Sequence, residues 1–366
     1  MQIIYDHQVF AFQRYGGISR YFVELAAHLI GGGDDDVRIV APCHQNEYLA
    51  DARLAGHVVG RKISRPLLIS RRRAIRWGNA LQLRAAWRGL QPDIIHETYF
   101  SPTRYGRGRI RVLTVYDMIH ELCPDELVQT AVQSAAKRAA VARADHMICI
   151  SASTQSDLQR VFGVAAEKTS VVHLGHALAT AAGPSVATAS ATPYMLHVGD
   201  RAAYKNFASL VRAYASSARL RGDFRLIAFG GRGFNADERQ LLQTLGIADR
   251  VSHITGDDQL LAAHYRDARL FVCPSRYEGF GLPSLEAMAQ GCPVACSNGG
   301  SIPEVVGDAG EYFDPLDLDA MRAAIERVAF DEPRRTQLIE SGRRRAAMFS
   351  WQQCAERTRA VYQRLL

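Results

Sequence analysis

Two glutamates and a glycine-rich loop in the segment 275–294 have the clearest chemical meaning in this chain. The segment reads Ser-Arg-Tyr-Glu-Gly-Phe-Gly-Leu-Pro-Ser-Leu-Glu-Ala-Met-Ala-Gln-Gly-Cys-Pro-Val, with Glu278 in the loop, Glu286 on the expected helix and seven residues between them. A glycine-rich loop between a strand and a helix presents free backbone N–H groups and the positive end of the helix dipole to an anion. Carboxylates beside such a site repel a bare phosphate, so we expect them to contact sugar hydroxyls of the same ligand. The segment therefore predicts a nucleotide-sugar site.

Two cations precede another expected helix. The loop 199–206 reads Gly-Asp-Arg-Ala-Ala-Tyr-Lys-Asn and joins an expected strand to a helix over 207–220. Arg201 and Lys205 beside a helix N-terminus predict a diphosphate clamp that needs no metal ion. Surface loops often carry such cations without a ligand. However, the carboxyl ends of parallel strands share one edge of a sheet, so this loop and the glutamate segment can converge.

Other strand ends carry weaker signals, each with an ordinary structural alternative. Gly230 and Gly231 allow a ligand to approach the backbone, or form a tight turn. Thr255 and Asp257 could receive a base or a ribose, although Asp257 or its neighbour Asp258 could equally cap the following helix.

The N-terminal half carries similar signals. Gly16 and Gly17 precede a helix at the first strand–helix crossing and suit a backbone near a phosphate or a sugar. Asp117 and His120 follow another strand end and could point into a cleft. The alternatives are a helix cap for Asp117 and a hydrogen bond to the backbone for His120.

The elements that must position these residues alternate regularly along the chain. The expected strands cover 2–5, 37–41, 93–96, 112–116, 146–150, 170–174, 194–198, 225–229, 251–255, 270–273, 294–297 and 311–313. Apolar strands that alternate with amphipathic helices predict parallel sheets covered on both faces. The fold class is therefore α/β, with two doubly wound Rossmann-like domains over 1–178 and 194–348 joined by a small-residue linker, 179–193. The cleft between the domains is the expected ligand site.

The composition excludes several classes of protein. At 366 residues, 48% hydrophobic and 22% charged, the chain can build two full cores. The sequence has no apolar run long enough to span a membrane and begins directly with a strand, which predicts a cytoplasmic location. The seven cysteines are scattered and match no zinc spacing, so we expect reduced thiols and no metal.

Basic residues are concentrated in one part of the chain. Between Arg61 and Arg111, thirteen lysines and arginines accompany only two acids, Asp93 and Glu97. Such a bias suits an anionic membrane surface or nucleic acid. A nucleic-acid partner is not expected, because the chain lacks a helix-turn-helix or a platform of interleaved aromatic residues. A solvated basic face without a partner is the plain alternative.

The segment 275–294 resembles the signature of the retaining glycosyltransferases of family 4, which have the GT-B fold: two glutamates, with seven residues between them, around Gly-Phe-Gly. The loop 199–206, the linker, the strand order, the run Ser-Ile-Pro-Glu-Val-Val-Gly at 301–307 and Phe-Ser-Trp at 349–351 also resemble that family. The resemblance covers essentially the whole chain. It implies that 349–366 forms a helix that crosses back onto the N-terminal domain. Within the family, the chain looks most similar to bacterial mannosyltransferases that build O-antigen polysaccharide.

The resemblance implies a role for each matching residue. Arg201 and Lys205 would bind the diphosphate, Glu286 would hold the ribose hydroxyls and Glu278 would contact the donor sugar. Backbone amides would come from the start of the next helix, namely Phe280, Gly281 and Leu282. The donor phosphate would be approached from the other domain by Gly16 and Gly17.

One position departs from the family pattern. Many members have His-Asp where this chain has Tyr116-Asp117, so a tyrosine replaces a histidine assigned to donor or acceptor contact. Asp117 is then our first choice for the polar catalytic contact. Tyr116 and His120 are placed on the acceptor side.

The implied activity is that of a retaining, metal-independent hexosyltransferase that uses no cofactor. The resemblance favours GDP-mannose as the nucleotide-sugar donor and a lipid-linked oligosaccharide as the acceptor, in the synthesis of O-antigen, lipopolysaccharide or capsule. The basic stretch between Arg61 and Arg111 would hold the enzyme on anionic lipid at the inner face of the cytoplasmic membrane. Two alternatives stay open: a phosphorylase or sugar-nucleotide epimerase of similar fold, and a non-catalytic glycan- or nucleotide-binding subunit of a polysaccharide assembly complex.

Overall fold

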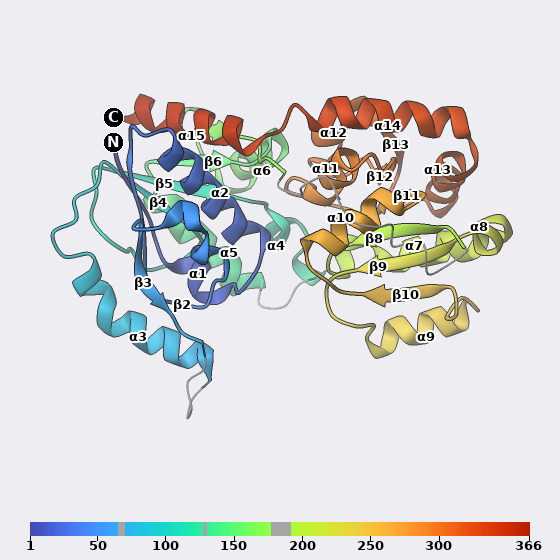
Figure 1. Cartoon of the computed structure of the whole chain (residues 1–366), viewed down its shortest axis with the longest axis horizontal. Helices are drawn as coiled ribbons and strands as arrows, with labels where there is room; N and C mark the ends of the chain where they lie inside the picture. The colour runs from blue at the N-terminus through green and yellow to red at the C-terminus, as the bar shows by residue number, and fades with distance from the viewer. Residues whose placement is uncertain (65–69, 127–129, 177–191) are drawn as a thin grey trace.

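Two parallel sheets flanked by helices form the molecule (Figure 1). The computed structural model describes residues 1–64, 70–126, 130–176 and 192–366. The first sheet has seven strands in the order β3-β2-β1-β4-β5-β6-β7, and the second has six in the order β10-β9-β8-β11-β12-β13. Each pair of neighbouring strands is parallel. The predicted α/β class with two doubly wound sheets is confirmed.

The first sheet and its helices occupy the N-terminal half. Its strands are β1 (Gln2–Tyr5), β2 (Asp36–His44), β3 (Val58–Lys62), β4 (Ile94–Glu97), β5 (Ile110–Val115), β6 (His146–Cys149) and β7 (Thr169–Val171). Its helices are α1 (Gln8–Phe12), α2 (Gly17–Gly31), α3 (Arg71–Ala86), α4 (Ile119–Leu122), α5 (Thr130–Arg143) and α6 (Ala152–Phe162).

The second sheet follows the same plan. Its strands are β8 (Tyr194–Val198), β9 (Arg225–Phe229), β10 (Val251–Ile254), β11 (Leu270–Cys273), β12 (Val294–Ser297) and β13 (Gly310–Phe313). The helices are α7 (Phe207–Ser216), α8 (Ala218–Asp223), α9 (Ala236–Thr244), α10 (Asp258–Asp267), α11 (Leu282–Ala289), α12 (Ile302–Val306), α13 (Leu318–Phe330), α14 (Glu332–Ala346) and α15 (Trp351–Leu365).

The strands read as unbroken apolar runs because helices cover both of their faces. In β1, Ile3, Ile4 and Tyr5 are fully buried, and all four residues of β12 are fully buried as well. Within the described parts of the chain, no helix is both long and apolar enough to cross a bilayer. Of the predicted linker 179–193, residues 179–191 lie outside the described residues.

Two elements differ from the sequence-based expectation. Strand β3 was not expected, because it is an edge strand with exposed residues and contains Gly60, Arg61 and Lys62 instead of an apolar run. The single helix expected over 207–220 is two helices. Ser217 adopts an extended backbone and its side chain accepts the N–H of Leu220, which ends α7 and caps α8.

Helix α15 follows α14 after a short connection and crosses onto the N-terminal half of the molecule (Figure 1, red). Its buried face packs along α2. The Tyr362 hydroxyl lies 2.5 Å from Nδ1 of His96 on β4 and 3.5 Å from the Tyr5 hydroxyl. Burial lowers the pKa of His96 to about 3, so the imidazole is neutral and its hydrogen bond to Tyr362 stays inside the core.

Candidate active site

Glu278 and Lys205 form a compact polar centre at the carboxyl edge of the second sheet. Lys205 ends the loop after β8, and its Nζ lies 2.7 and 2.9 Å from the two carboxylate oxygens of Glu278. The hydroxyl of Ser275, just beyond β11, donates to Glu278 Oε1 at 2.6 Å. Burial opposes the charge on Lys205, but Glu278 outweighs that effect and holds the lysine pKa above its ordinary value. The predicted cation and the loop glutamate therefore meet directly.

Gly279 brings this centre against the N-terminal half of the molecule. Its carbonyl accepts the hydroxyl of Ser151 at 2.7 Å and that of Thr154 at 3.2 Å. A Cβ on residue 279 would lie 1.9 Å from the Tyr116 carbonyl oxygen and 3.0 Å from Cβ of Asp117. Only glycine permits this approach, which places Asp117 beside Glu278.

Asp117 is the acidic residue of the N-terminal half at this junction. Its side chain is 28% exposed, accepts the N–H of Ile119 at 3.1 Å and lies 3.6 Å from Nζ of Lys137. The N–H contact matches the structural alternative of a cap, yet the partial exposure leaves the carboxylate accessible. His120 follows on α4; burial and Lys137 lower its pKa, and its Nδ1 has no hydrogen-bond partner among the described residues.

Tyr116 lies below the site rather than within it. The residue is 6% exposed and its hydroxyl donates to the Thr98 carbonyl at 2.9 Å. The chain therefore places a buried, hydrogen-bonded phenol where many family members have histidine, whereas the Asp117 side chain is 28% exposed.

The N-termini of helices α2 and α11 face each other across the site. A Cβ on Gly17, the first residue of α2, would lie 3.9 Å from the Leu282 side chain at the start of α11. The N-cap residues Gly16 and Gly281 have no side chain that could cap a helix. In α2, the Gln13 side chain accepts the N–H of Ser19 at 3.0 Å instead. Gly281 has φ of 89°, which favours glycine. Two partially positive helix ends thus converge on one space, a setting that suits an anion.

Glu286 lies on α11, and the Tyr265 hydroxyl donates to its Oε2 at 3.3 Å. Burial raises the pKa of Glu286 to about 7, against an opposing effect of Arg20. Arg20 comes from α2 and forms an ion pair of 2.5 Å with Asp258 on α10. The two halves of the molecule therefore also meet beside Glu286.

The remaining predicted residues lie around this centre. Thr255 follows β10, and Asp257 caps α10 by accepting the N–H of Leu260 at 2.9 Å, which is the structural alternative considered above. Gly230 and Gly231 have φ of 86° and 66° in the turn after β9. Both glycines thus serve the turn geometry, which is the structural alternative considered above.

Arg201 is not brought to Lys205 in this structure. Its guanidinium binds Glu238 at 2.8 Å and the Arg232 carbonyl, and it lies over the Phe234 ring at 4.9 Å. The side chain is only 5% exposed. A phosphate contact by Arg201 would require release from Glu238.

Several contributors escaped the sequence analysis. The sequence analysis considered Asp258 only as a possible helix cap, and it missed the ion pair with Arg20 because a pair between distant helices leaves no local pattern. Glu304 on α12 was noted only as part of a family-like run. Its carboxylate accepts the N–H groups of Ala152 and Ser153 at 2.8 and 3.1 Å, at the N-terminus of α6, and His173 lies 2.6 Å away. The glutamate thus joins the two halves of the molecule, a role visible only after folding.

Comparison with known proteins agrees with this architecture. The family model described as "Glycosyltransferase Family 4" matches residues 15–179, and that described as "Glycosyl transferases group 1" matches residues 184–345. The chain belongs to the glycosyltransferases that combine these two domains, and the resemblance stated above is confirmed.

Two curated relatives are mannosyltransferases. O-antigen chain mannosyltransferase B of Escherichia coli is 41% identical over 177 residues, 47% of this chain and 46% of that protein. The MMP alpha-(1->4)-mannosyltransferase of Mycolicibacterium hassiacum is 34% identical over 234 residues, 60% of this chain and 54% of that protein. The matched region spans about half the length of each relative.

Solved structures share the fold over the full length. Sucrose-phosphate synthase from Thermosynechococcus elongatus superposes with a TM-score of 0.76 at 22% identity and covers 100% of this chain and 98% of its own. HepE of Anabaena, in complex with UDP-glucose, gives 0.75 at 18% identity and covers 99% of both chains. At these identities the likeness concerns the fold alone.

Proposed function

We propose that this protein is a retaining hexosyltransferase that moves mannose from GDP-mannose to a hydroxyl of a growing, lipid-linked surface polysaccharide. The observation that carries the proposal is the convergence of the Lys205–Glu278 pair, Asp117 and two helix N-termini that begin after a glycine on one space. Cations and amides suit a diphosphate, and carboxylates suit sugar hydroxyls.

The proposed chemistry is governed by charge. As the glycosidic bond to the diphosphate breaks, positive charge develops on the sugar ring and negative charge on the leaving phosphate. Lys205 and the amides at the start of α11 would stabilise the phosphate without a metal ion, and loss of one such donor typically costs about a hundred- to a thousandfold in rate. We favour attack by the acceptor on the same face, with the leaving phosphate as the base, because no side chain is positioned convincingly as a nucleophile.

The relatives support the donor and the acceptor. Two similar proteins are named as mannosyltransferases, and one of them acts on an O-antigen chain. A structure of the same fold holds UDP-glucose, which supports a nucleotide sugar as the donor class. Glu286 would hold the ribose hydroxyls and Glu278 the sugar.

A membrane surface is proposed as the second partner. Helix α3 exposes Trp77 (61%) and Leu81 (82%), which follow Arg73 at intervals of four residues and so share one face. Exposed apolar residues beside arginines suit an anionic lipid surface. Arg111 takes no part, because it is buried against Glu97. Vesicles of phosphatidylglycerol should bind the wild type more strongly than Arg71→Gln/Arg73→Gln; equal binding would refute the membrane role.

The donor site is tested by thermal shift with GDP-, UDP- and dTDP-sugars. We expect GDP-mannose to stabilise the wild type, and Lys205→Ala and Glu286→Ala to abolish the shift. Asp249→Ala is the matched control, because this carboxylate is 81% exposed in a loop away from the site. If both site variants keep the full shift, the site assignment fails.

Turnover separates the proposal from its rivals. The release of GDP only when an acceptor glycan is present would argue against a phosphorylase or an epimerase. Normal donor binding without transfer to any lipid-linked acceptor would instead favour a non-catalytic subunit.

A further inference from the structure

A long groove runs between helix α3 and the loop that joins β4 to β5. Two pockets, of about 400 and about 870 Å³, both include Leu83 of α3 and Tyr105 of the loop in their walls, so they lie next to each other along the groove. From Ile75 in the first pocket to Trp87 in the second, the helix advances about 18 Å. Each pocket is of a size that small-molecule sites commonly have.

The near end of the groove reaches the candidate active site. Phe12 lines it and packs edge-on against Tyr99 at 4.7 Å between ring centroids. Tyr99 in turn stacks on Tyr116, with ring centroids 6.4 Å apart, and Asp117 is the next residue along the chain. His7 also lines this end. It is 7% exposed, and its Nδ1 has no hydrogen-bond partner within the part of the chain that the structure describes.

The far end of the groove is basic. Its wall includes three exposed arginines, Arg84, Arg104 and Arg107. None of them forms an ion pair with a described residue, and the described walls of both pockets contain no aspartate or glutamate. Unpaired arginines without acidic neighbours suit a phosphate or a carboxylate of a ligand.

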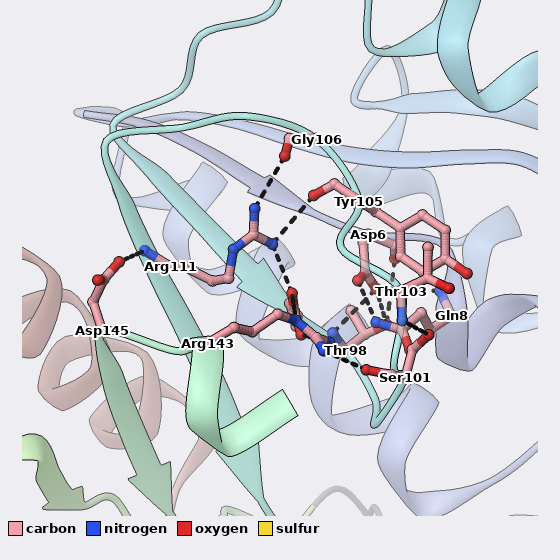
Figure 2. A network of polar contacts seen from close by, with 11 residues as sticks. Asp6, Gln8, Thr98, Ser101, Thr103, Tyr105, Gly106, Arg111, Arg143 and Asp145 are labelled. Carbon is pink, nitrogen blue, oxygen red and sulfur yellow. Dashed lines mark hydrogen bonds and ion pairs between the residues drawn. The ribbon is translucent and has the colours of Figure 1, made fainter. Parts of the chain in front are cut away.

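A buried polar network holds the loop in place (Figure 2). Glu97, fully buried at the end of β4, binds Arg111 at 2.6 Å and Arg143 at 2.5 Å. These arginines donate to backbone carbonyls of the loop: Arg111 to Tyr105 and Gly106 at 3.1 and 3.0 Å, and Arg143 to Ser101. The loop wall is therefore set before any ligand arrives.

Aromatic rings and a glycine complete that wall. Tyr105 packs edge-on against His7 at 4.6 Å. Gly106, with φ of 67°, lies so close to Trp87 that a Cβ would approach its ring to 2.3 Å. This close packing joins the loop to the C-terminal end of α3, and both Gly106 and Trp87 line the second pocket.

We propose that this groove binds the acceptor glycan behind its reacting hydroxyl, with sugar units against the aromatic near end and a phosphate group at Arg84, Arg104 and Arg107. The inference rests on the proposed function and adds the binding path and the charge of its acceptor. It predicts that recognition extends well beyond the sugar that receives the new residue.

Direct binding tests the groove without turnover. We compare three probes by calorimetry in the absence of donor: propyl α-mannoside, propyl mannotetraoside and a mannotetraose linked to an alkyl phosphate. The wild type should bind the phosphate-linked tetraose most tightly. Arg84→Ala/Arg107→Ala should weaken that binding at least about tenfold and leave the short mannoside unaffected. Arg38→Ala/Arg138→Ala removes two charges from the same domain outside the groove and should change affinity less than about threefold.

Each outcome is decisive for one of the two proposals. Equal affinity for all three probes, or an equal loss in the control variant, overturns the groove assignment. Competition by phosphatidylglycerol vesicles at the groove arginines overturns it in favour of a lipid site. If the tetraose phosphate binds as expected but no sugar is ever transferred to it from a nucleotide-sugar donor, with release of the nucleoside diphosphate, the proposed function fails instead. Transfer with a KM independent of acceptor length and of Arg84 and Arg107 would refute the groove alone.

Discussion

The Glu278 carboxylate is nearly buried in the candidate site, and two neighbouring side chains satisfy it. Lys205 and Ser275 satisfy it, and only 8% of the residue is exposed. A donor diphosphate would compete with Glu278 for the same ammonium group. The Lys205–Glu278 ion pair would thus hold the two loops together before the donor binds. Once the diphosphate takes Lys205, the hydroxyls of the donor sugar would have to replace the lysine as hydrogen-bond donors to Glu278.

Glu286 makes a prediction about pH. Its pKa in the folded protein is about 7, against an ordinary value of 4.5, because burial disfavours the charge. The raised pKa contributes stability that is complete below about pH 4.5 and is lost as the pH rises through about 7. The free energy of unfolding should fall over that window by on the order of 2–3 kcal/mol more in the wild type than in Glu286→Gln. Urea denaturation at pH 5 and pH 8 checks this.

Donor binding should have the opposite pH dependence. Ribose hydroxyls donate to a carboxylate better than to a carboxylic acid, so donor affinity should rise as the pH passes about 7. Calorimetry in two buffers of different ionisation enthalpy would detect the proton released. An affinity that is flat between pH 6 and 8 would contradict the assignment of Glu286 to the ribose.

At the residue level, local sequence patterns identified part of the candidate site. The sequence pointed to the loop glutamate, to Lys205 and to the helix start at Gly281, because each follows a strand end of one parallel sheet. It could not reveal that Arg201 is engaged by Glu238, because two residues 37 positions apart meet only in the folded protein. Their roles in catalysis stay predictions.

At the level of elements, Gly279 is the position where a loop of one domain docks on the other. Gly279→Ala would force its Cβ against the Tyr116 carbonyl, a backbone atom that cannot turn aside. We expect a loss of roughly 1–3 kcal/mol in the free energy of unfolding and a larger loss of transfer activity, because the loop carries Glu278. Thermal denaturation and a transfer assay measure the two effects.

Gly222 in helix α8 is the matched control. An alanine there would meet no atom within 4 Å, so Gly222→Ala should be neutral or stabilise the helix by up to about 1 kcal/mol. If Gly279→Ala is as stable as Gly222→Ala, the junction accommodates a Cβ at residue 279 and the predicted steric role of Gly279 is wrong.

The elements themselves were largely predictable, because continuous apolar runs between amphipathic stretches have few other solutions. Strand β3 escaped because an exposed edge strand needs no apolar pattern. The break at Ser217 escaped because a serine inside a helical pattern is tolerated as often as it caps. Both omissions concern places where tertiary contacts, rather than periodicity, decide the structure.

For the whole molecule, Arg20 and Asp258 link the two halves beside Glu286. Asp258 is 58% exposed, so the pair alone should contribute little to stability. Arg20→Ala should therefore leave the melting temperature nearly unchanged. It should shift the pH midpoint of donor binding upward, because Arg20 lowers the pKa of Glu286. Donor titrations at several pH values decide the matter, and an unchanged midpoint would show that Arg20 does not act on Glu286.

The position of helix α15 has a consequence for co-translational folding. Strand β7 completes the first sheet at Val171, yet the helix that packs along α2 begins only at Trp351. At about 5–20 residues per second, the roughly 190 residues between them take about 10–40 s to synthesise. During that interval the face of α2 that α15 will cover is exposed in the nascent first domain, and His96 and Tyr5 lack their contacts with Tyr362. The second domain can fold before α15 is made. Chaperone dependence should therefore be concentrated in this interval, and a chain released before α15 should aggregate through its first half.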